Sequence, residues 1–126
     1  MNERPRATVL MIGLRSDAVD YEKWPELDRS KLEAGFETIA ADVEAAGHRP
    51  VWCLVDGGPS AASQVADAID AESPDVVLIG AGVRADPEHF ALFEELINVV
   101  HAAAPRARIA FNTNPFDSVE AIARRV

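Results

Sequence analysis

The short apolar run VVLI at residues 76–79, between Pro74 and Gly80, most constrains how this chain folds. A run this short that is apolar at every position is typical of a strand buried on both faces, as in the middle of a parallel sheet. A glycine turn follows it, and Asp86 with the proline after it supplies an N-cap and a first-turn proline for a helix. Ligands of open α/β folds lie beyond the carboxyl ends of such strands, so residues 80–84 are the first place to expect a site.

Three further apolar runs predict strands, and stretches with helical periodicity alternate with the strands along the chain. Strands are expected at residues 7–13, 50–55 and 107–111, and helices after Asp28, at 61–71, at 87–103 and after Asp117. Strict alternation implies parallel strands joined by right-handed crossovers. We therefore predict one α/β domain over residues 1–126, a three-layer sandwich whose four-stranded parallel sheet has the order 2-1-3-4.

Helix ends and buried faces are predicted at single residues. Asp28 and Ser60 are expected as N-caps, and Gly47 as the residue just past a helix C-terminus. Asp117, with Glu120 three residues later, has the spacing of a capping box. The helix at 87–103 is expected to turn its apolar face inward through Phe90, Phe93, Leu96, Ile97 and Val100.

Charge and composition exclude several classes of partner. The formal net charge is −9 and no run of Lys or Arg occurs, so we expect neither nucleic acid nor an anionic membrane as a partner. The single cysteine, Cys53, lies within an apolar run, which excludes a disulfide scaffold and indicates a buried thiol. No apolar stretch approaches about 18 residues and no leader-type segment opens the chain, so a cytoplasmic location is expected.

Four loops are expected to meet at the carboxyl ends of the strands, at residues 13–17, 56–60, 80–84 and 112–114. Arg15 and Arg84 in these loops have the planar guanidinium fork that binds carboxylate or phosphate in bidentate fashion, so we expect a small anionic ligand. The other ligand-binding candidates are Gly80, Gly82 and Asn114, together with Asp56 and Asn112, which would orient hydroxyls or amides. Two alternatives stay open: the arginines pair with Asp17 and Asp86 on a solvated rim, or Asp56 only starts a turn.

Asp17 and His89 are the candidates for moving a proton. His89 follows the Asp86 cap by three residues, and a helix N-terminus there would help to keep its imidazole neutral. The alternative for His89 is a structural place in the capping turn. His48 and His101 are expected to be structural or at the surface, and the three histidines are too dispersed for a metal site.

Residues 14–27 form a connection much longer than is usual between a strand and a helix. Tyr21 and Trp24 lie in it and are expected to fold over the site as an apolar lid that excludes water. Packing of Trp24 on the first helix, as a hydrophobic staple before Asp28, is the alternative.

No cofactor is predicted. The dinucleotide fingerprint is missing after the first strand, and the near match at residues 80–85 lies on the third strand beside Asp86, whose carboxylate would repel a pyrophosphate. A Walker-type lysine loop is absent from the sequence as well.

The layout resembles, over the whole chain, the flavodoxin-like (Rossmann-like) group that includes flavodoxins, receiver domains and cobalamin-binding domains. The phosphate loop, the phospho-accepting aspartate and the Asp-x-His-x-x-Gly loop of those three subgroups do not occur here. Residues 79–84 (IGAGVR), 97–101 (INVVH) and 111–115 (FNTNP) resemble segments of small uncharacterised bacterial proteins. This resemblance implies a stand-alone cytoplasmic protein and assigns no activity.

Two functions are therefore carried forward from the sequence. The first is binding, and in its enzymatic version transformation, of a small anionic ligand at the carboxyl ends of the strands. The alternative is a non-catalytic protein-interaction module or a homodimeric scaffold that uses the exposed edge of the fourth strand, since unpaired strand edges attract partners. A homodimer is expected, and light scattering that gave a monomer would contradict it.

Overall fold

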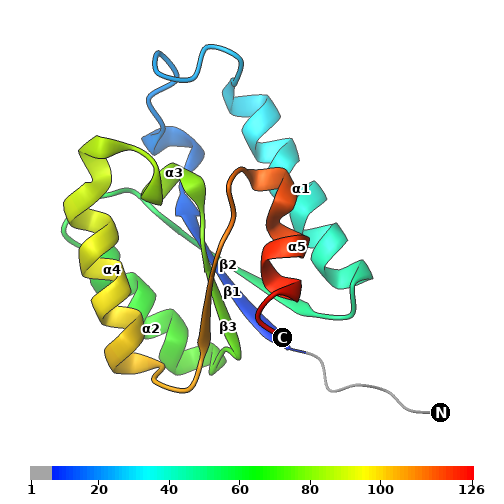
Figure 1. The fold of residues 1–126 in the computed structure, drawn as a ribbon. Helices are drawn as coiled ribbons and strands as arrows, with labels where there is room; N and C mark the ends of the chain where they lie inside the picture. Colours follow the sequence, from blue (N-terminus) through cyan, green and yellow to red (C-terminus); the bar gives the residue numbers. More distant parts are fainter. Residues whose placement is uncertain (1–6) are drawn as a thin grey trace.

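The computed structural model describes residues 7–126, apart from the side chain of residue 115. Within this range the strands form one parallel sheet of order β2-β1-β3-β4, which confirms the predicted topology (Figure 1). The strands are β1 (Thr8–Leu14), β2 (Arg49–Val55), β3 (Val76–Ile79) and β4 (Arg108–Phe111). β1 pairs with both β2 and β3, so the two most apolar strands are central as predicted.

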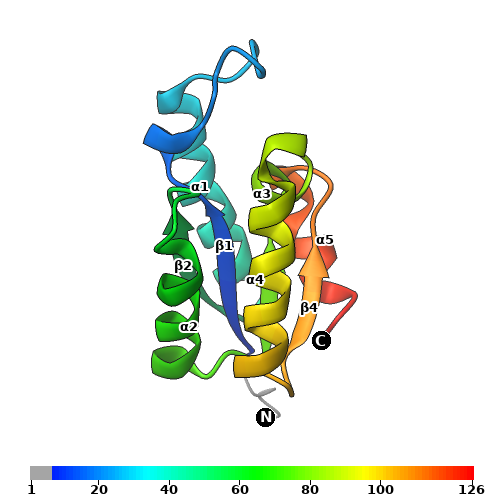
Figure 2. The same cartoon turned by 90° about the vertical axis from the view of Figure 1, so that its left-hand side faces the viewer.

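Helices cover both faces of the sheet and make the three-layer sandwich. One face carries α1 (Arg29–Ala45) and α5 (Ser118–Ala123), and the other carries α2 (Ala61–Glu72) and α4 (Phe90–Ala103) (Figure 1, Figure 2). The shorter elements are α3 (Ala81–Arg84) and the 3-10 turns η1 (Ser16–Ala18), η2 (Pro87–His89) and η3 (Pro115–Asp117). Among residues 7–126 we find no helix with both the length and the apolar character needed to cross a bilayer.

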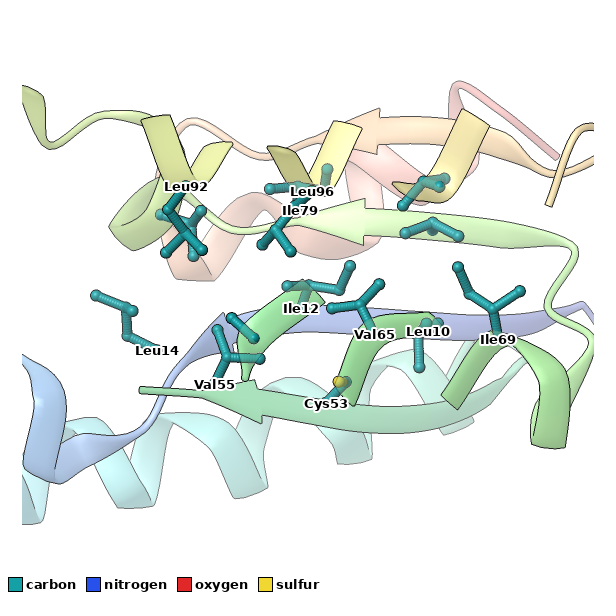
Figure 3. Packing of buried hydrophobic residues seen from close by; sticks show 14 residues of the cluster. Leu10, Ile12, Leu14, Cys53, Val55, Val65, Ile69, Ile79, Leu92 and Leu96 are labelled. Carbon is teal, nitrogen blue, oxygen red and sulfur yellow. The ribbon is translucent and has the colours of Figure 1, made fainter. Parts of the chain in front are cut away.

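The core is divided by the sheet because successive side chains of a strand point to opposite faces. On β1, Leu10 and Ile12 face α2 and α4, whereas Val9 and Met11 face α1 and α5. The first of these clusters is shown in Figure 3, where Leu92 and Leu96 of α4 and Val65 and Ile69 of α2 close on the sheet. β3 is buried at all of its positions. The sheet is thus a rigid platform that fixes the loops at its carboxyl end.

Helix ends agree with the sequence at some residues and not at others. Asp28 caps α1 by accepting a hydrogen bond from Lys31 N at 2.8 Å, and Gly47 ends it with φ at 95°, both as predicted. Ser60 was wrongly predicted as a cap: it has helical backbone angles and its side chain makes no cap bond. The chain enters α2 through a turn in which Ala61 N donates to Gly58 O, so no side-chain cap is needed.

Two further local predictions are wrong because a 3-10 turn precedes the helix in each case. η2 shifts the start of α4 to Phe90, which is 64% exposed and was wrongly predicted to face inward, whereas Phe93, Leu96, Ile97 and Val100 pack in the core as predicted. The capping box lies one turn earlier than predicted: Asn114 Oδ1 accepts from Phe116 N at 2.8 Å, and the Asp117 carboxylate accepts from Asn114 N. Asp117 is therefore the last residue of the capping box that Asn114 begins, and its side chain does not cap α5.

Candidate functional site

A pocket of about 340 Å³ opens at the carboxyl ends of β1, β3 and β4, where three of the four predicted loops meet; no residue of the loop at 56–60 lines it. We name it the carboxyl-end pocket. α3 and the segment behind it supply one side through Ala81, Gly82, Ala85, Asp86 and His89, and Leu14 closes the floor. The connection between η1 and α1 supplies the roof, which Figure 1 shows above the carboxyl end of the sheet.

The roof is tied down at both ends by hydrogen bonds. Tyr21 Oη donates to Ser16 O at 2.6 Å, and the Ser16 hydroxyl donates to Glu33 Oε2 at 2.6 Å. The Ser16 hydroxyl, followed by the Arg29 guanidinium, lowers the pKa of Glu33 by stabilising its carboxylate. On the other side, Lys23 Nζ lies 3.0 Å from both Asp86 Oδ1 and Glu88 Oε2. These contacts hold the connection across the pocket.

Of the two lid candidates, only one reaches the pocket. Trp24 lines it and keeps 42% of its surface exposed, while Val19 and Leu27 complete the apolar roof. The hydroxyl of Tyr21 donates to Ser16 O, and Tyr21 is not among the residues that line the pocket. Trp24 thus lies where a lid residue must lie, and Tyr21 anchors the segment that carries it.

Asp86 is the buried charge of this site, with only 6% of its surface exposed. Its carboxylate accepts from Glu88 N at 3.0 Å and from Lys23 Nζ, and the backbone bond, followed by the ammonium, lowers the pKa of Asp86. His89 Nε2 lies 3.9 Å from Asp86 Oδ2. The other edge of the ring packs on the turn at Gly57, where an added Cβ would lie 3.5 Å from the His89 Cε1. One wall therefore holds an ionised carboxylate next to an imidazole.

The two arginines expected to bind an anion do not line the carboxyl-end pocket. Arg15 Nη2 lies 2.7 Å from Asp17 Oδ2, and both side chains are about half exposed, which is the rim pairing held open from the sequence. Arg84 does not pair with Asp86: it donates to Asn112 O, and its guanidinium carbon lies 5.9 Å from the centre of the Phe111 ring. The structure thus separates Arg15 and Asp17 from His89.

Asn112 holds secondary-structure elements together. It is buried, its Oδ1 accepts from Ala81 N at 2.9 Å, and its Nδ2 donates to Ser118 Oγ at 3.1 Å. It therefore joins the end of β4 to the starts of α3 and α5. Asp56 Oδ1 accepts from Gly58 N at 2.8 Å, which makes the turn considered as its alternative role.

The remaining candidates lie at or near the pocket. Asn114 lines the pocket and also caps η3. At Gly80 an added Cβ would lie 3.2 Å from Ile12 O, so glycine permits the close approach of β3 to β1 there. Gly82 is on the pocket surface, and an added Cβ would meet no atom within 4 Å. An inner cavity of about 80 Å³ shares Gly82 and Leu14 with the carboxyl-end pocket and extends towards Asn112.

Sequence reasoning missed the role of Lys23 and the apolar character of the pocket. The signal for Asp86 was present as a predicted cap, but nothing local in the sequence pairs it with a lysine 63 positions earlier. No group of three or more His, Cys, Asp or Glu among the described residues is arranged to hold a metal ion. Burial raises the pKa of the Cys53 thiol, which lies in the core and away from the pocket.

No family model matches the chain, and no curated protein matches it either. Function is therefore argued from the carboxyl-end pocket and its residues.

Proposed function

We propose that this protein binds a small organic molecule in the carboxyl-end pocket, with the apolar body of the ligand under Trp24. The observation that carries the proposal is a pocket of about 340 Å³ at the carboxyl ends of the central strands, in which apolar side chains, Trp24 among them, lie beside a few acidic ones. Ligand pockets are typically of this size, mostly apolar, with a few convergent polar groups, and open α/β folds place them at this edge.

The charges of the lining favour a neutral or cationic ligand. Asp20, Glu26 and Asp86 line the pocket, and Lys23, the nearest ammonium, is already paired with Asp86 and Glu88. A carboxylate entering here would face like charges, whereas an amine or a hydroxyl could donate to them. The anionic ligand expected from the sequence is the competing class, and it would need Lys23 to leave Asp86.

His89 is the residue that we propose to move a proton for a bound ligand. It lines the pocket, and its Nε2 lies 3.9 Å from Asp86 Oδ2, so the ring is positioned to exchange a proton with a bound ligand. Asp17, the other candidate, lies in the rim pair with Arg15. The interaction-module alternative has weaker support at β4, because Arg124 Nη2 donates to Phe111 O at 3.0 Å and covers part of that strand edge.

The test uses three probes that share one ring: benzylamine, benzyl alcohol and benzoate. Binding is followed by the fluorescence of Trp24 in a Trp52→Phe background. We expect saturable changes with the amine and the alcohol, and a much weaker change with benzoate. Gly82→Leu should abolish these fluorescence changes. No atom lies within 4 Å of a Cβ added at Gly82, so the leucine side chain fits without a clash and fills the pocket.

The matched control is Gly35→Leu, because Gly35 is a helical glycine in α1 with equally open space and no place in the pocket. Binding that survives in Gly82→Leu, or no binding of any probe, would contradict the proposal. A preference for benzoate that disappears in Lys23→Gln would instead support the anionic class. A probe that raises the melting temperature without any change in Trp24 fluorescence would argue against Trp24 as a lid.

A further inference from the structure

A second hollow lies at the opposite end of the sheet, at the amino ends of β1, β3 and β4. Its volume is about 370 Å³, and we name it the amino-end groove. Three arginines line it: Arg106 from the turn after α4, Arg108 at the start of β4, and Arg125 just past α5. Figure 1 shows the end of the chain, after α5, near the start of β1, and residues from both places line the groove.

These three are the lysine or arginine residues whose side chains have no partner among residues 7–126. Arg15, Arg29, Arg49 and Lys23 each form an ion pair with a carboxylate. Arg84, Arg124 and Lys31 donate to backbone carbonyls. Arg106, Arg108 and Arg125 make no ion pair or side-chain hydrogen bond with any residue from 7 to 126.

Chance is a poor explanation for this arrangement in so acidic a protein. The chain has 21 acidic and 12 basic residues, so carboxylates that could pair with arginines are in excess. The acid in the groove, Asp75, accepts a hydrogen bond from Thr8 N at 2.8 Å and forms no ion pair with a residue between 7 and 126. Three like charges around one hollow repel each other, and a bound anion of multiple charge would turn that repulsion into attraction.

Attraction of cations to helix C-termini explains the group only in part. Arg106 follows α4 and Arg125 follows α5, where a positive charge complements the helix dipole. Arg108 begins a strand, however, so no helix end accounts for it. What the three arginines share is the groove itself.

We propose that the amino-end groove binds a small anion that carries phosphoryl groups. The guanidinium fork matches the oxygens of a phosphoryl group in bidentate geometry, and several forks around one hollow suit an anion of multiple charge. The groove is large enough for a diphosphate with an organic substituent. This site is at the other end of the sheet from the carboxyl-end pocket, so the two proposals stand or fall separately.

The experiment is a calorimetric titration of the full chain with pyrophosphate at constant ionic strength, with citrate and sulfate as competing anions. We expect saturable binding of pyrophosphate that is tighter than that of citrate. Arg108→Gln and the double variant Arg106→Gln/Arg125→Gln should each weaken it by about tenfold or more, because each loses charge-assisted hydrogen bonds.

The control is Arg29→Gln, which removes an exposed arginine whose partner is Glu33 on the same helix, and binding should not change there. Without ligand, Arg108→Gln should melt at the same or a higher temperature than the unaltered chain, because it relieves repulsion, so lost binding cannot be ascribed to unfolding. Equal weakening in Arg29→Gln would overturn the proposal, since it would mean diffuse attraction only. Absence of saturable binding, or citrate bound as tightly as pyrophosphate, would overturn it as well.

Discussion

Asn112→Leu is the substitution that most sharply separates a structural role from a binding role at the carboxyl end of the sheet. The sequence suggests that Asn112 orients a ligand. In the structure its side chain is 4% exposed and bridges two helix starts through Ala81 N and Ser118 Oγ. Leucine has a similar size and can neither accept nor donate, so it removes both bonds with little change in volume.

The expected cost follows from these two bonds. Each hydrogen bond contributes about 0.5–1.5 kcal/mol to the free energy of unfolding, but where its loss leaves a donor without an acceptor the cost is about 1–3 kcal/mol instead. Ala81 N is such a donor, since it donates to Asn112 Oδ1 at the start of α3. We therefore expect Asn112→Leu to lower the free energy of unfolding by about 2–4 kcal/mol, and the melting temperature by roughly 10 °C.

The assay is urea unfolding followed by circular dichroism, with Asn98→Leu as the matched control. Asn98 is an exposed asparagine of α4 whose Nδ2 donates to Glu94 O at 2.9 Å, so its loss should cost less than about 1 kcal/mol. Equal effects of the two substitutions would refute the structural role of Asn112. A normal free energy of unfolding combined with lost ligand binding would restore the role suggested by the sequence.

Two further predictions use the titratable groups. Since the pKa of Asp86 is lowered, by the Glu88 backbone N–H first and then by Lys23, its charge stabilises the fold above the unfolded-state pKa of about 3.9 and is lost as pH falls through the lower folded-state pKa. Asp86→Asn should therefore flatten the fall of the urea midpoint between about pH 5 and pH 2, and an unchanged fall would contradict this. Burial raises the pKa of the Cys53 thiol, so it should resist Ellman's reagent in the folded protein and react fully in urea; immediate labelling of the folded protein would show that the thiol is accessible.

The sheet could be predicted because its signals are local. β3 is apolar at all its positions, and its neighbours alternate with helical stretches, which leaves few arrangements for parallel strands. Asp28 and Gly47 were predictable for the same reason, since a cap acts within one turn. The exposure of Phe90 was not predictable, because the 3-10 turn at residues 87–89 makes it the first residue of α4, before the buried face begins. Periodicity identifies the buried face of a helix but not the residue at which the helix starts.

For the candidate site, the sequence indicated the location of the pocket better than the contacts that each side chain makes. Three of the four predicted loops contribute to the pocket at the carboxyl ends and the loop at 56–60 does not, while His89, Gly82, Asn114 and Trp24 line it. Arg84 and Asn112 were harder to interpret, because their contacts join residues about 30 positions apart. A polar residue after a strand can face solvent, a ligand or another element, and only packing decides among these. Lys23 was missed for the same reason.

The distribution of charge offers a last argument about ligands. Acidic side chains line the carboxyl-end pocket, while unpaired arginines gather around the amino-end groove. An anion that stabilises the whole protein could therefore act at the end of the sheet opposite the one expected from the sequence. Gly82→Leu and Arg108→Gln separate the two cases: stabilisation lost only in Arg108→Gln assigns the anion to the groove, and stabilisation lost only in Gly82→Leu assigns it to the pocket. Because the two ends favour opposite charges, stabilisation of the fold by a bound cation should be lost in Gly82→Leu and kept in Arg108→Gln.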